Sequence, residues 1–498
     1  MDTTDYGSGI PFVHSILDRA CEQYADAPAV RDDDGVWTYA EVARRSHAMA
    51  HWLAGQGVRP GDRVLVQMET QRDLVALFMA VSRVGAIFVP LNTAMKAFHL
   101  QAVLRDAEPV IVIGGGELTA ALAELATVPV HDHTEMTGDG DLPCATPQTL
   151  AGSDVAVIVY TSGSTSLPKG VVEPHAQVVF ATYSLGAALG YRADDVVFCR
   201  FPISWDYGLY KVLLVFAAGC EIVLAPTGAD LTLLKRIVET GTTVLPLVPS
   251  LAGMLTTLAR RQPGLTAPVR LISNTGAALP EATIAQLREV FPGARVVRQF
   301  GQTECKRITV MPPEEDTERP GCVGLPMPGT QVRIAGPDGQ SLPAGEVGEI
   351  VASGRHVMAG YWRNPELSAR TFQTDPDGTP ILRSGDYGWM DADGYLYFEG
   401  RRDDMFKRKG IRVSALEIEA AAMDVPGVSN ACVVPPGERH DLGICVVTDL
   451  NEKDVIRELR LRLEPAKVPA ICRRVDAIPL TTHGKHAVDQ LRPLLIGA

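Results

Sequence analysis

The chain has 498 residues, of which 46% are hydrophobic and 21% charged, a balance typical of globular proteins. This length exceeds the usual size of one compact core, so we expect two or more domains. With 46 basic and 59 acidic residues, the formal charge of −13 disfavours non-specific nucleic-acid binding, because phosphate backbones attract basic surfaces.

The N-terminal sequence MDTTDYGSGIPF lacks the basic and apolar regions of a secretory signal. The most apolar stretch, 212–220, is far shorter than the roughly 20 residues that a membrane-spanning helix needs. The nine cysteines are scattered without a CxxC pair, which indicates reduced thiols rather than disulfides or a zinc site. We therefore expect a soluble cytoplasmic protein with small-molecule substrates, without a nucleic-acid or membrane partner.

Strand and helix signals alternate along the first 330 residues. Helical spacing of apolar residues predicts helices over 71–83 and 211–218, whereas 186–210 is expected to be rich in loops. This alternation is typical of layered α/β folds with a mainly parallel sheet. Short apolar runs predict strands at 62–66, 86–91, 110–113, 155–160, 221–224 and 269–273.

The pattern changes near residue 330, where short strands are separated by glycine and proline. Runs at 331–334, 348–353 and 394–399 predict a small antiparallel, β-barrel-like part. A charged segment follows and precedes an α+β tail. The predicted domains are a large N-terminal domain at 1–400, a hinge at 401–404 and a small mobile C-terminal domain at 405–498.

Residues 160–170, YTSGSTSLPKG, follow an apolar strand and are typical of a phosphate-binding loop. Small hydroxyl residues and glycines let backbone N–H and side-chain O–H groups converge on anionic oxygens, and Lys169 adds a cation. The loop differs from the P-loop of common NTPases, in which glycine precedes lysine. Taken alone, the segment is also compatible with a flexible surface loop.

Four further segments follow in order: FGQTE at 300–304, SGD at 384–386, GRRDDMFKRKG at 400–410 and THGK at 482–485. With the phosphate loop, they resemble the family of AMP-forming adenylating enzymes, which includes acyl-CoA synthetases, peptide-synthetase adenylation domains and luciferases. The resemblance covers nearly the whole chain. It implies an enzyme that uses ATP and Mg²⁺ to activate a carboxylate as an acyl-adenylate and then passes the acyl group to a pantetheine thiol.

The resemblance also implies roles for single residues. Thr303 would contact the α-phosphate, Glu304 would hold Mg²⁺, and Lys485 would stabilise the negative charge that develops as pyrophosphate leaves. Lys169 completes this catalytic set, and Ser166 departs from the family, which usually has glycine there. The other residues expected to bind ATP are Thr161, Ser162, Gly163, Ser164, Thr165, Gly276, Ala277, Ala278, Phe300, Asp386 and Arg401.

Members of this family rotate the small domain between the two half-reactions, because adenylation and thiol transfer need different groups over one site. Asp403 matches the hinge position, and Gly410 matches the glycine beside the pantetheine path. The basic residues of 401–412 would dock CoA phosphates or an acidic carrier protein, or they form an ordinary solvated face.

The segment FPISWDYGLY at 201–210 bears on the identity of the acid. Many acyl- and aryl-CoA ligases have a histidine and then an apolar residue at positions 205–206, whereas amino-acid-activating domains have an aromatic residue and then an aspartate, which binds the substrate ammonium. Asp206 fits the second pattern, and Arg307 would bind a further carboxylate bidentately. The remaining predicted pocket residues are Tyr207, Tyr210, Ser250, Ser273, Thr275, Gln299 and Ile308.

Asp206 and Arg307 together resemble free-standing adenylation enzymes that load β-amino acids, including an aspartate-type acid, onto carrier proteins. Because the sequence ends soon after Lys485, we expect the carrier to be a separate protein. One alternative is a structural salt bridge between Asp206 and Arg307. Another is a CoA ligase for an aryl, alkyl or carnitine-like acid, which the sequence at 90–92 favours. A non-catalytic nucleotide-binding protein would be expected to have lost some of Lys169, Glu304, Asp386, Arg401 and Lys485.

Overall fold

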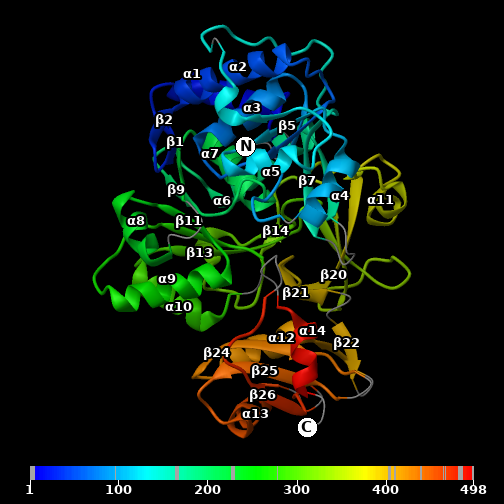
Figure 1. Ribbon diagram of the computed structural model, residues 1–498. Coiled ribbons are helices and arrows are strands. Elements are labelled where there is room, and N and C mark those ends of the chain that lie inside the picture. Colours follow the sequence, from blue (N-terminus) through cyan, green and yellow to red (C-terminus); the bar gives the residue numbers. More distant parts are fainter. Residues whose placement is uncertain are drawn as a thin grey trace.

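Two large sheets with helices packed on them form most of the molecule, and a small separate unit forms its C-terminal end (Figure 1). The computed structural model describes residues 6–95, 97–138, 140–162, 168–225, 230–276, 279–401, 405–408, 411–437, 440–463, 465, 467–480 and 486–495.

The first sheet has the strand order β18-β8-β7-β4-β3-β5-β6. Strands β3 to β7 are parallel to one another. At one side of the sheet, β8 pairs antiparallel with β7, and β18 pairs antiparallel with β8. The expected strands at 62–66, 86–91, 110–113 and 155–160 are confirmed to within two residues. The elements are β3 (Arg63–Gln67), α3 (Arg72–Arg83), β4 (Ile87–Pro90), α4 (Ala97–Ala107), β5 (Ile111–Gly114), α5 (Glu117–Ala123), β6 (Val130–Asp132), η1 (His133–Glu135), β7 (Val155–Ser162), β8 (Pro168–Pro174) and β18 (Gly360–Tyr361).

The second sheet has the order β15-β14-β13-β12-β11-β9-β10-β1-β2. Its central strands are parallel, and antiparallel strands close both ends. The strands are β1 (Pro28–Asp32), β2 (Gly35–Thr38), β9 (Val196–Cys199), β10 (Glu221–Leu224), β11 (Val244–Leu247), β12 (Leu271–Asn274), β13 (Arg295–Phe300), β14 (Thr309–Val310) and β15 (Leu325–Pro326).

Two apolar helices, α6 (His175–Leu189) and α7 (Asp206–Ala218), join the sheets. Helix α6 contacts β7 and β8, α7 contacts β9 and β10, and the two helices pack on each other. The expectation of a loop-rich segment at 186–210 is wrong, because it contains the end of α6, strand β9 and the start of α7. Helix α6 is buried on most sides and lacks the one-sided periodicity that marks surface helices.

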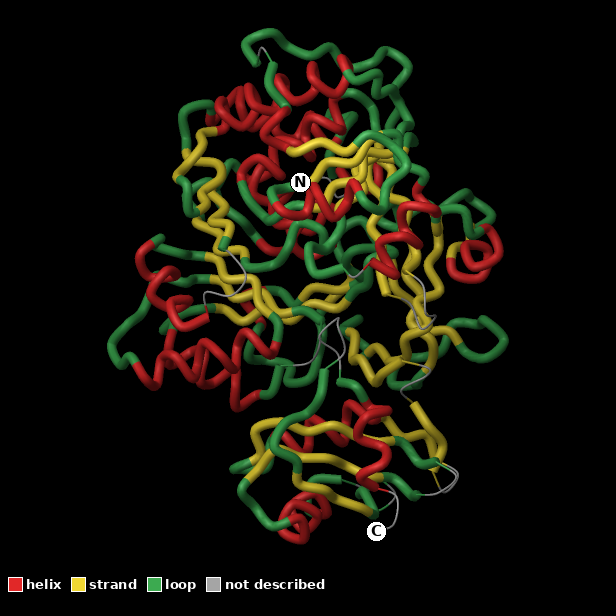
Figure 2. Tube along the Cα trace, in the orientation of Figure 1, coloured by secondary structure: helices red, strands yellow, loops and turns green. Residues whose placement is uncertain are grey.

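The remaining helices form two groups: α1 and α2 pack on α3, and α1 also packs on α6 and α7, whereas α8 and α10 pack on α9. Figure 2 shows them in red around the yellow strands. Among the described residues, every helix is too short or too polar to span a bilayer. These elements are α1 (Val13–Tyr24), α2 (Tyr39–Gly55), η2 (Asp230–Thr232), α8 (Leu233–Glu239), α9 (Pro249–Arg261), α10 (Glu281–Val290) and η3 (Pro313–Glu315).

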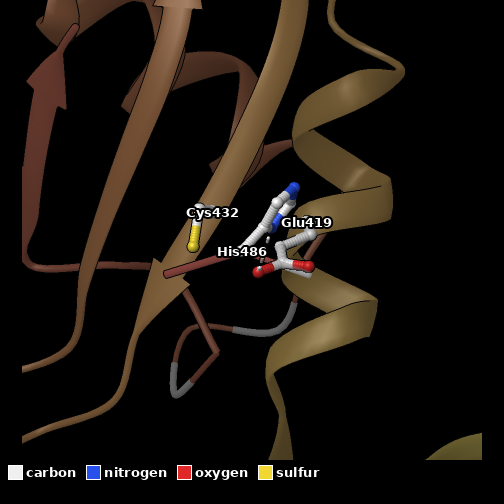
Figure 3. Close-up of side chains that lie close together, drawn as sticks. All are labelled: Glu419, Cys432 and His486. Atoms are coloured by element: carbon white, nitrogen blue, oxygen red, sulfur yellow. Dashed lines mark ion pairs between the residues drawn. The ribbon is translucent and has the colours of Figure 1, made fainter. Parts of the chain in front are cut away.

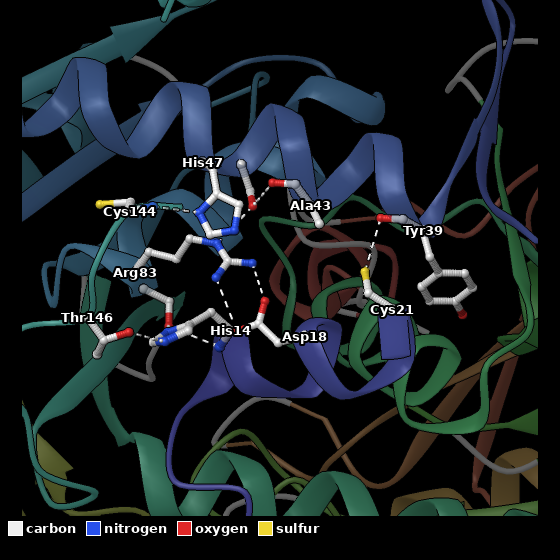
Figure 4. A network of polar contacts seen from close by, with 11 residues as sticks. His14, Asp18, Cys21, Tyr39, Ala43, His47, Arg83, Cys144 and Thr146 are labelled. Carbon is white, nitrogen blue, oxygen red and sulfur yellow. Dashed lines mark hydrogen bonds and ion pairs between the residues drawn. The ribbon is translucent and has the colours of Figure 1, made fainter. Parts of the chain in front are cut away.

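A buried polar network ties α1, α2 and α3 together (Figure 4). The guanidinium of Arg83, which is 2% exposed, lies 2.5 Å from the carboxylate of Asp18. The ring of His14 bonds the hydroxyl of Ser82 at 2.9 Å and that of Thr146 at 3.0 Å. Burial lowers the pKa of His14 well below its ordinary value. The network therefore fixes the loop after η1 to the helices of the large domain.

A five-stranded antiparallel sheet follows where the sequence predicted a small antiparallel part. Its longest strand, β20, pairs with β17, β19 and β21. The bounds are β16 (Gln331–Ala335), β17 (Gly348–Ser353), α11 (Pro365–Thr371), β19 (Phe372–Thr374), β20 (Pro380–Met390) and β21 (Leu396–Arg401).

The small C-terminal unit, orange to red in Figure 1, has its own apolar core around Ile418, Ile444 and Leu459. The expected class, a mixed α/β fold with a large N-terminal and a small C-terminal domain, is confirmed. Most of the predicted hinge, 402–404, lies outside the described residues. The unit comprises β22 (Met405–Arg408), β23 (Ile411–Ser414), α12 (Ala415–Met423), β24 (Val428–Val434), β25 (Gly443–Thr448), α13 (Glu452–Arg460), β26 (Ile471–Arg474), α14 (Val488–Leu491) and η4 (Arg492–Leu495).

Candidate functional site

The phosphate loop and the FGQTE segment meet at Tyr361 of β18. Thr161 on β7 and Lys169 on β8 are cross-strand partners at the two ends of the loop. The ammonium of Lys169 lies 4.7 Å from the centre of the Tyr361 ring. The Tyr361 hydroxyl donates a hydrogen bond of 2.6 Å to Oε1 of Glu304. The fold thus brings two motifs together that lie far apart in the sequence.

The turn after β13 orients the FGQTE residues. A Cβ on Gly301 would lie 2.5 Å from the carbonyl oxygen of Lys306, so the tight approach requires glycine. Lys306 itself has a φ of +67°, in the left-handed region that disfavours side chains. Within this turn Thr303 is half-buried and Glu304 is buried. One turn therefore holds Glu304 against Tyr361 and turns Lys306 toward other partners.

The SGD segment lies beside the same turn. The Gln302 side-chain amide donates to the carbonyl oxygen of Ser384 at 3.3 Å. Asp386 of β20 is 3% exposed and stands opposite Arg401 of β21 in the strand register. The residues predicted to bind ribose are therefore adjacent on paired strands.

Phe300 is 8% exposed and packs against Phe398, with ring centres 4.8 Å apart. Gly276 is exposed at the end of β12 with a φ of +87°. Nucleotide contacts of these residues stay predictions. The side chains of Ser162 and Arg401 lie outside the described part of the structure. The predicted residues that lie wholly outside it are Gly163, Ser164, Thr165, Ser166, Ala277, Ala278, Asp403, Gly410 and Lys485.

The predicted acid pocket begins at the N-terminus of α7. Trp205 is the N-cap residue and Asp206 the first residue of the helix. A Cβ on Gly208 would lie 2.2 Å from the carbonyl oxygen of Pro202, so glycine lets the helix start close against the preceding segment. The Tyr207 hydroxyl donates to the carbonyl oxygen of Ser273 at 2.8 Å. This contact fixes the first turn of α7 to β12.

Asp206 is paired with a residue that the sequence analysis missed. The ammonium of Lys306, 1% exposed, lies 2.5 Å from Oδ1 of Asp206 and also forms an ion pair with Glu173 of β8. The ring of Tyr210 lies 4.7 Å from the same ammonium. Burial opposes the charge of Lys306, but Asp206 and Glu173 outweigh it and raise its pKa. The sequence signal that could have pointed to Glu173 was a charged residue within the otherwise apolar run of β8.

Arg307 contacts only neutral groups among the described residues. Its Nε donates to Oε1 of Gln299 at 2.8 Å, and its Nη1 donates to the carbonyl oxygen of Lys306. Its guanidinium carbon lies 5.1 Å from the centre of the Tyr207 ring. The alternative of an Asp206–Arg307 salt bridge is contradicted, because Lys306 occupies the carboxylate instead. Of the other predicted pocket residues, Tyr210, Ser273, Thr275, Gln299 and Ile308 are buried, whereas Ser250 is exposed.

A second buried lysine lies beside Tyr207. Lys211 is 1% exposed, and its ammonium lies 4.5 Å from the centre of the Tyr207 ring. Its Nζ has no hydrogen-bond partner among the described side chains and backbone. Burial, with the charge of Arg307 added, lowers the pKa of Lys211 to about 7. Three basic residues, Lys211, Arg307 and Lys306, thus lie against the rings of Tyr207 and Tyr210.

Within the part of the chain that the structure describes, one further group of side chains could hold a metal ion, and it belongs to the small domain. Glu419, Cys432 and His486 place their ligand atoms within 4.8 Å of one another (Figure 3). Glu419 Oε1 already accepts the Val433 N–H at 2.8 Å and lies 3.9 Å from His486 Nδ1. The predicted magnesium ligand, Glu304, belongs to the large domain, so this group is a different one.

Family models match both parts of the chain. The model described as AMP-binding enzyme matches residues 17–362, and that described as AMP-binding enzyme C-terminal domain matches 417–485. A feruloyl-CoA synthase from Amycolatopsis sp. is 30% identical over 95% of this chain and 97% of its own length. A linear gramicidin synthase from Brevibacillus parabrevis is 29% identical over 95% of this chain, and the chain spans only 6% of that protein.

Solved structures of similar proteins extend the comparison. VinN is 46% identical with a TM-score of 0.73, over 78% of this chain and 98% of VinN. Further VinN structures, at 45% and 43% identity, are complexes with L-aspartate and with 3-methylaspartate. ATP-bound MatB from Rhodopseudomonas palustris is 28% identical with a TM-score of 0.85, over 97% and 99% of the two chains. The chain therefore belongs to the AMP-binding enzyme family and is an ATP-binding, adenylate-forming acid–thiol ligase.

Proposed function

We propose that the enzyme adenylates an amino acid that has a second carboxylate, of the aspartate or β-amino type, and loads it onto the phosphopantetheine thiol of a separate carrier protein. The observation that carries the proposal is that a carboxylate and a guanidinium, not paired with each other, both lie next to Tyr207. Asp206 offers a carboxylate at the start of α7, and Arg307 offers a guanidinium beside the ring of Tyr207. The first suits a substrate ammonium and the second a substrate carboxylate.

The surroundings of Arg307 support a carboxylate ligand. The residue is 5% exposed and bonds only a side-chain amide and a backbone carbonyl among the described residues. A buried cation ordinarily has an anionic partner, because desolvation of an unpaired charge is costly. A substrate carboxylate would supply that partner. The likeness to VinN, whose structures include aspartate and 3-methylaspartate complexes, points the same way.

The nucleotide side of the proposed site would carry out the first half-reaction. A carboxylate oxygen of the acid attacks the α-phosphorus of ATP, and the bond to the pyrophosphate oxygen breaks. We assign the phosphates to Lys169 and the loop before it, and the α-phosphate to Thr303. Glu304 is suited to hold Mg²⁺, since it is a carboxylate fixed by the Tyr361 hydroxyl, and the bound ion would neutralise phosphate charge. Lys485 would stabilise the charge on the α-phosphate.

In the second half-reaction the thiol sulfur attacks the carbonyl carbon of the adenylate. A thioester forms, the thiol proton is released to solvent, and AMP leaves with the electrons of the acyl–phosphate bond. We infer that the small domain rotates about 401–404 to exchange Lys485 for the pantetheine path at Gly410.

A CoA ligase for an acid without an amino group is the second candidate. The similarity to a feruloyl-CoA synthase over almost the full length of both proteins favours it. In that case CoA would be the acceptor, and Asp206 would have no substrate ammonium to bind.

ATP–pyrophosphate exchange across a panel of acids separates the two candidates. The panel contains aspartate, 3-methylaspartate, other α- and β-amino acids, aryl acids and fatty acids. We expect exchange with amino acids that have a second carboxylate. Exchange restricted to acids without an amino group would refute the proposal. Supplying the preferred acid with either CoA or a pantetheinylated carrier protein then identifies the acceptor by which thioester accumulates.

A further inference from the structure

Glu173 is a fully buried carboxylate at the edge of the proposed acid pocket. It lies in β8, where its neighbours Val171 and Val172 are part of an apolar run, and its exposed fraction is 0%. It forms an ion pair with Lys306, whose ammonium also lies 2.5 Å from Asp206. Two carboxylates, one from β8 and one from α7, therefore meet at one ammonium from the turn after β13.

The ion pair with Lys306 is the main contact of this carboxylate. Its other oxygen, Oε2, has no hydrogen-bond partner among the described residues. Burying a carboxylate costs much desolvation energy, and a well-packed apolar residue would often be no less stabilising at such a place. Stabilisation of the fold therefore does not explain well why a glutamate occupies position 173. Its effect on Lys306 explains it better.

The charges around Lys306 suggest what that effect is. If Lys306 faced Asp206 alone, the two would form a neutral pair, and an incoming ammonium would find the carboxylate already neutralised. Burial raises the pKa of Glu173 to about 7, so above that pH Glu173 is ionised and the group has two negative charges and one positive charge. One negative charge then remains uncompensated, and Asp206, at 14% exposed, is the more accessible of the two carboxylates.

We propose that Glu173 is a positioning residue that sets the specificity of the pocket for amino acids. By binding the ammonium of Lys306, it leaves the Asp206 carboxylate able to receive the ammonium of the substrate. The inference rests on the proposed function, in which Asp206 binds that ammonium. The guanidinium of Arg307 lies beside the Tyr207 ring, one residue from Asp206, so an uncompensated Lys306 would add a second positive charge there and disfavour a substrate ammonium.

The test compares an amino acid with its des-amino analogue, aspartate with succinate, in the exchange reaction of the full-length enzyme. The measured quantity is the ratio of their kcat/KM values. Both acids have the same two carboxylates, so any role of a residue in binding carboxylates largely cancels in this ratio. In Glu173→Gln we expect the ratio to fall about tenfold, mainly through a higher KM for aspartate.

Two further variants separate positioning from a structural role. In Glu173→Gln/Lys306→Met the competing ammonium is also removed, so we expect the preference for aspartate to return. In Lys306→Met alone the ratio should rise above that of the wild type. This variant keeps Glu173, so it tests the proposal even if the variants with Glu173→Gln do not fold. Asp195→Asn is the control, because it removes another buried carboxylate from an ion pair, with the partly exposed Arg270, and should leave the ratio unchanged.

The outcomes distinguish this inference from the proposed function. A wild-type enzyme that prefers succinate refutes the proposed function. A wild-type preference for aspartate that persists in a folded Glu173→Gln variant refutes only the role of Glu173. The role of Glu173 is also refuted if the double variant has a ratio as low as that of Glu173→Gln, or if the ratio in Lys306→Met is below that of the wild type.

Discussion

The two sides of the candidate site differ in how their residues are organised. On the nucleotide side, Lys169, Tyr361 and Glu304 form a chain of contacts whose main members come from motifs of fixed order. On the acid side, Asp206 and Glu173 meet at Lys306, and none of the three belongs to such a motif. The first arrangement suits a ligand that every family member shares, and the second a ligand that differs between members.

The two sides also differ in the cost of their charges. Glu173, Lys306 and Lys211 are at most 1% exposed, whereas on the nucleotide side Lys169 is half-buried and the buried carboxylate of Glu304 keeps an 8% exposed fraction. Buried charges weaken a fold unless a partner compensates them. We therefore expect substitutions on the nucleotide side to reduce catalysis for every acid, and substitutions on the acid side to change selectivity or stability.

The largest expected effect is that of Lys485→Ala. Removing the ammonium should lower adenylate formation about 100- to 1000-fold, the usual range for loss of one group that stabilises transition-state charge. Transfer of the acyl group from supplied adenylate to a thiol should be largely kept, because that step would use the other domain orientation. Pre-formed adenylate in single-turnover assays measures the second step. An equal loss of both steps would contradict domain rotation.

Asp206→Asn should have the next largest effect, confined to the acid side. We expect kcat/KM for the preferred amino acid to fall about 100-fold, because the substrate ammonium would lose a buried charged partner. The des-amino analogue should lose much less, and the KM for ATP should not change. Steady-state exchange kinetics with both acids provide the comparison. Unchanged exchange with amino acids would show that Asp206 does not bind the ammonium.

The nucleotide side was largely predictable from the sequence, and the acid side only in part. Motif order was sufficient to name Glu304 and Asp386, because the shared ligand fixes both residue types and spacing. Position in the sequence predicted Asp206 and Arg307 as pocket residues, but it did not predict the contacts that the structure gives them. Glu173 meets Lys306 across 133 positions of sequence, and only the three-dimensional pairing of β8 with the turn after β13 brings them together.

Tyr361 was missed for a related reason, since it belongs to the short strand β18 rather than to a motif.

Tyr361→Phe removes the hydroxyl that bonds Glu304 and should raise the KM for MgATP about tenfold, the effect of losing a hydrogen bond to a charged group. The amino-acid selectivity should stay constant. Tyr395→Phe is a matched control, because it removes a tyrosine–glutamate contact, with Glu315, outside the predicted nucleotide motifs. Similar KM changes in both variants would argue against a specific role for Tyr361.

The smallest expected effect concerns stability and tests the cost of the acid side. Burial lowers the pKa of Lys211 to about 7 from an unfolded value near 10.5, so between these pH values the unfolded chain binds more protons than the folded one. The folded state therefore becomes more stable as pH rises through this window. Lys211→Met removes this penalty and should stabilise the protein by about 1–2 kcal/mol at pH 7, with a gain that shrinks toward pH 10. Denaturant unfolding at both pH values measures it, and Lys235→Met, an exposed lysine in an i,i+4 ion pair, serves as control. A stability gain that does not change with pH would mean that Lys211 keeps an ordinary pKa. Its burial would then not lower the free energy of unfolding in the way expected here.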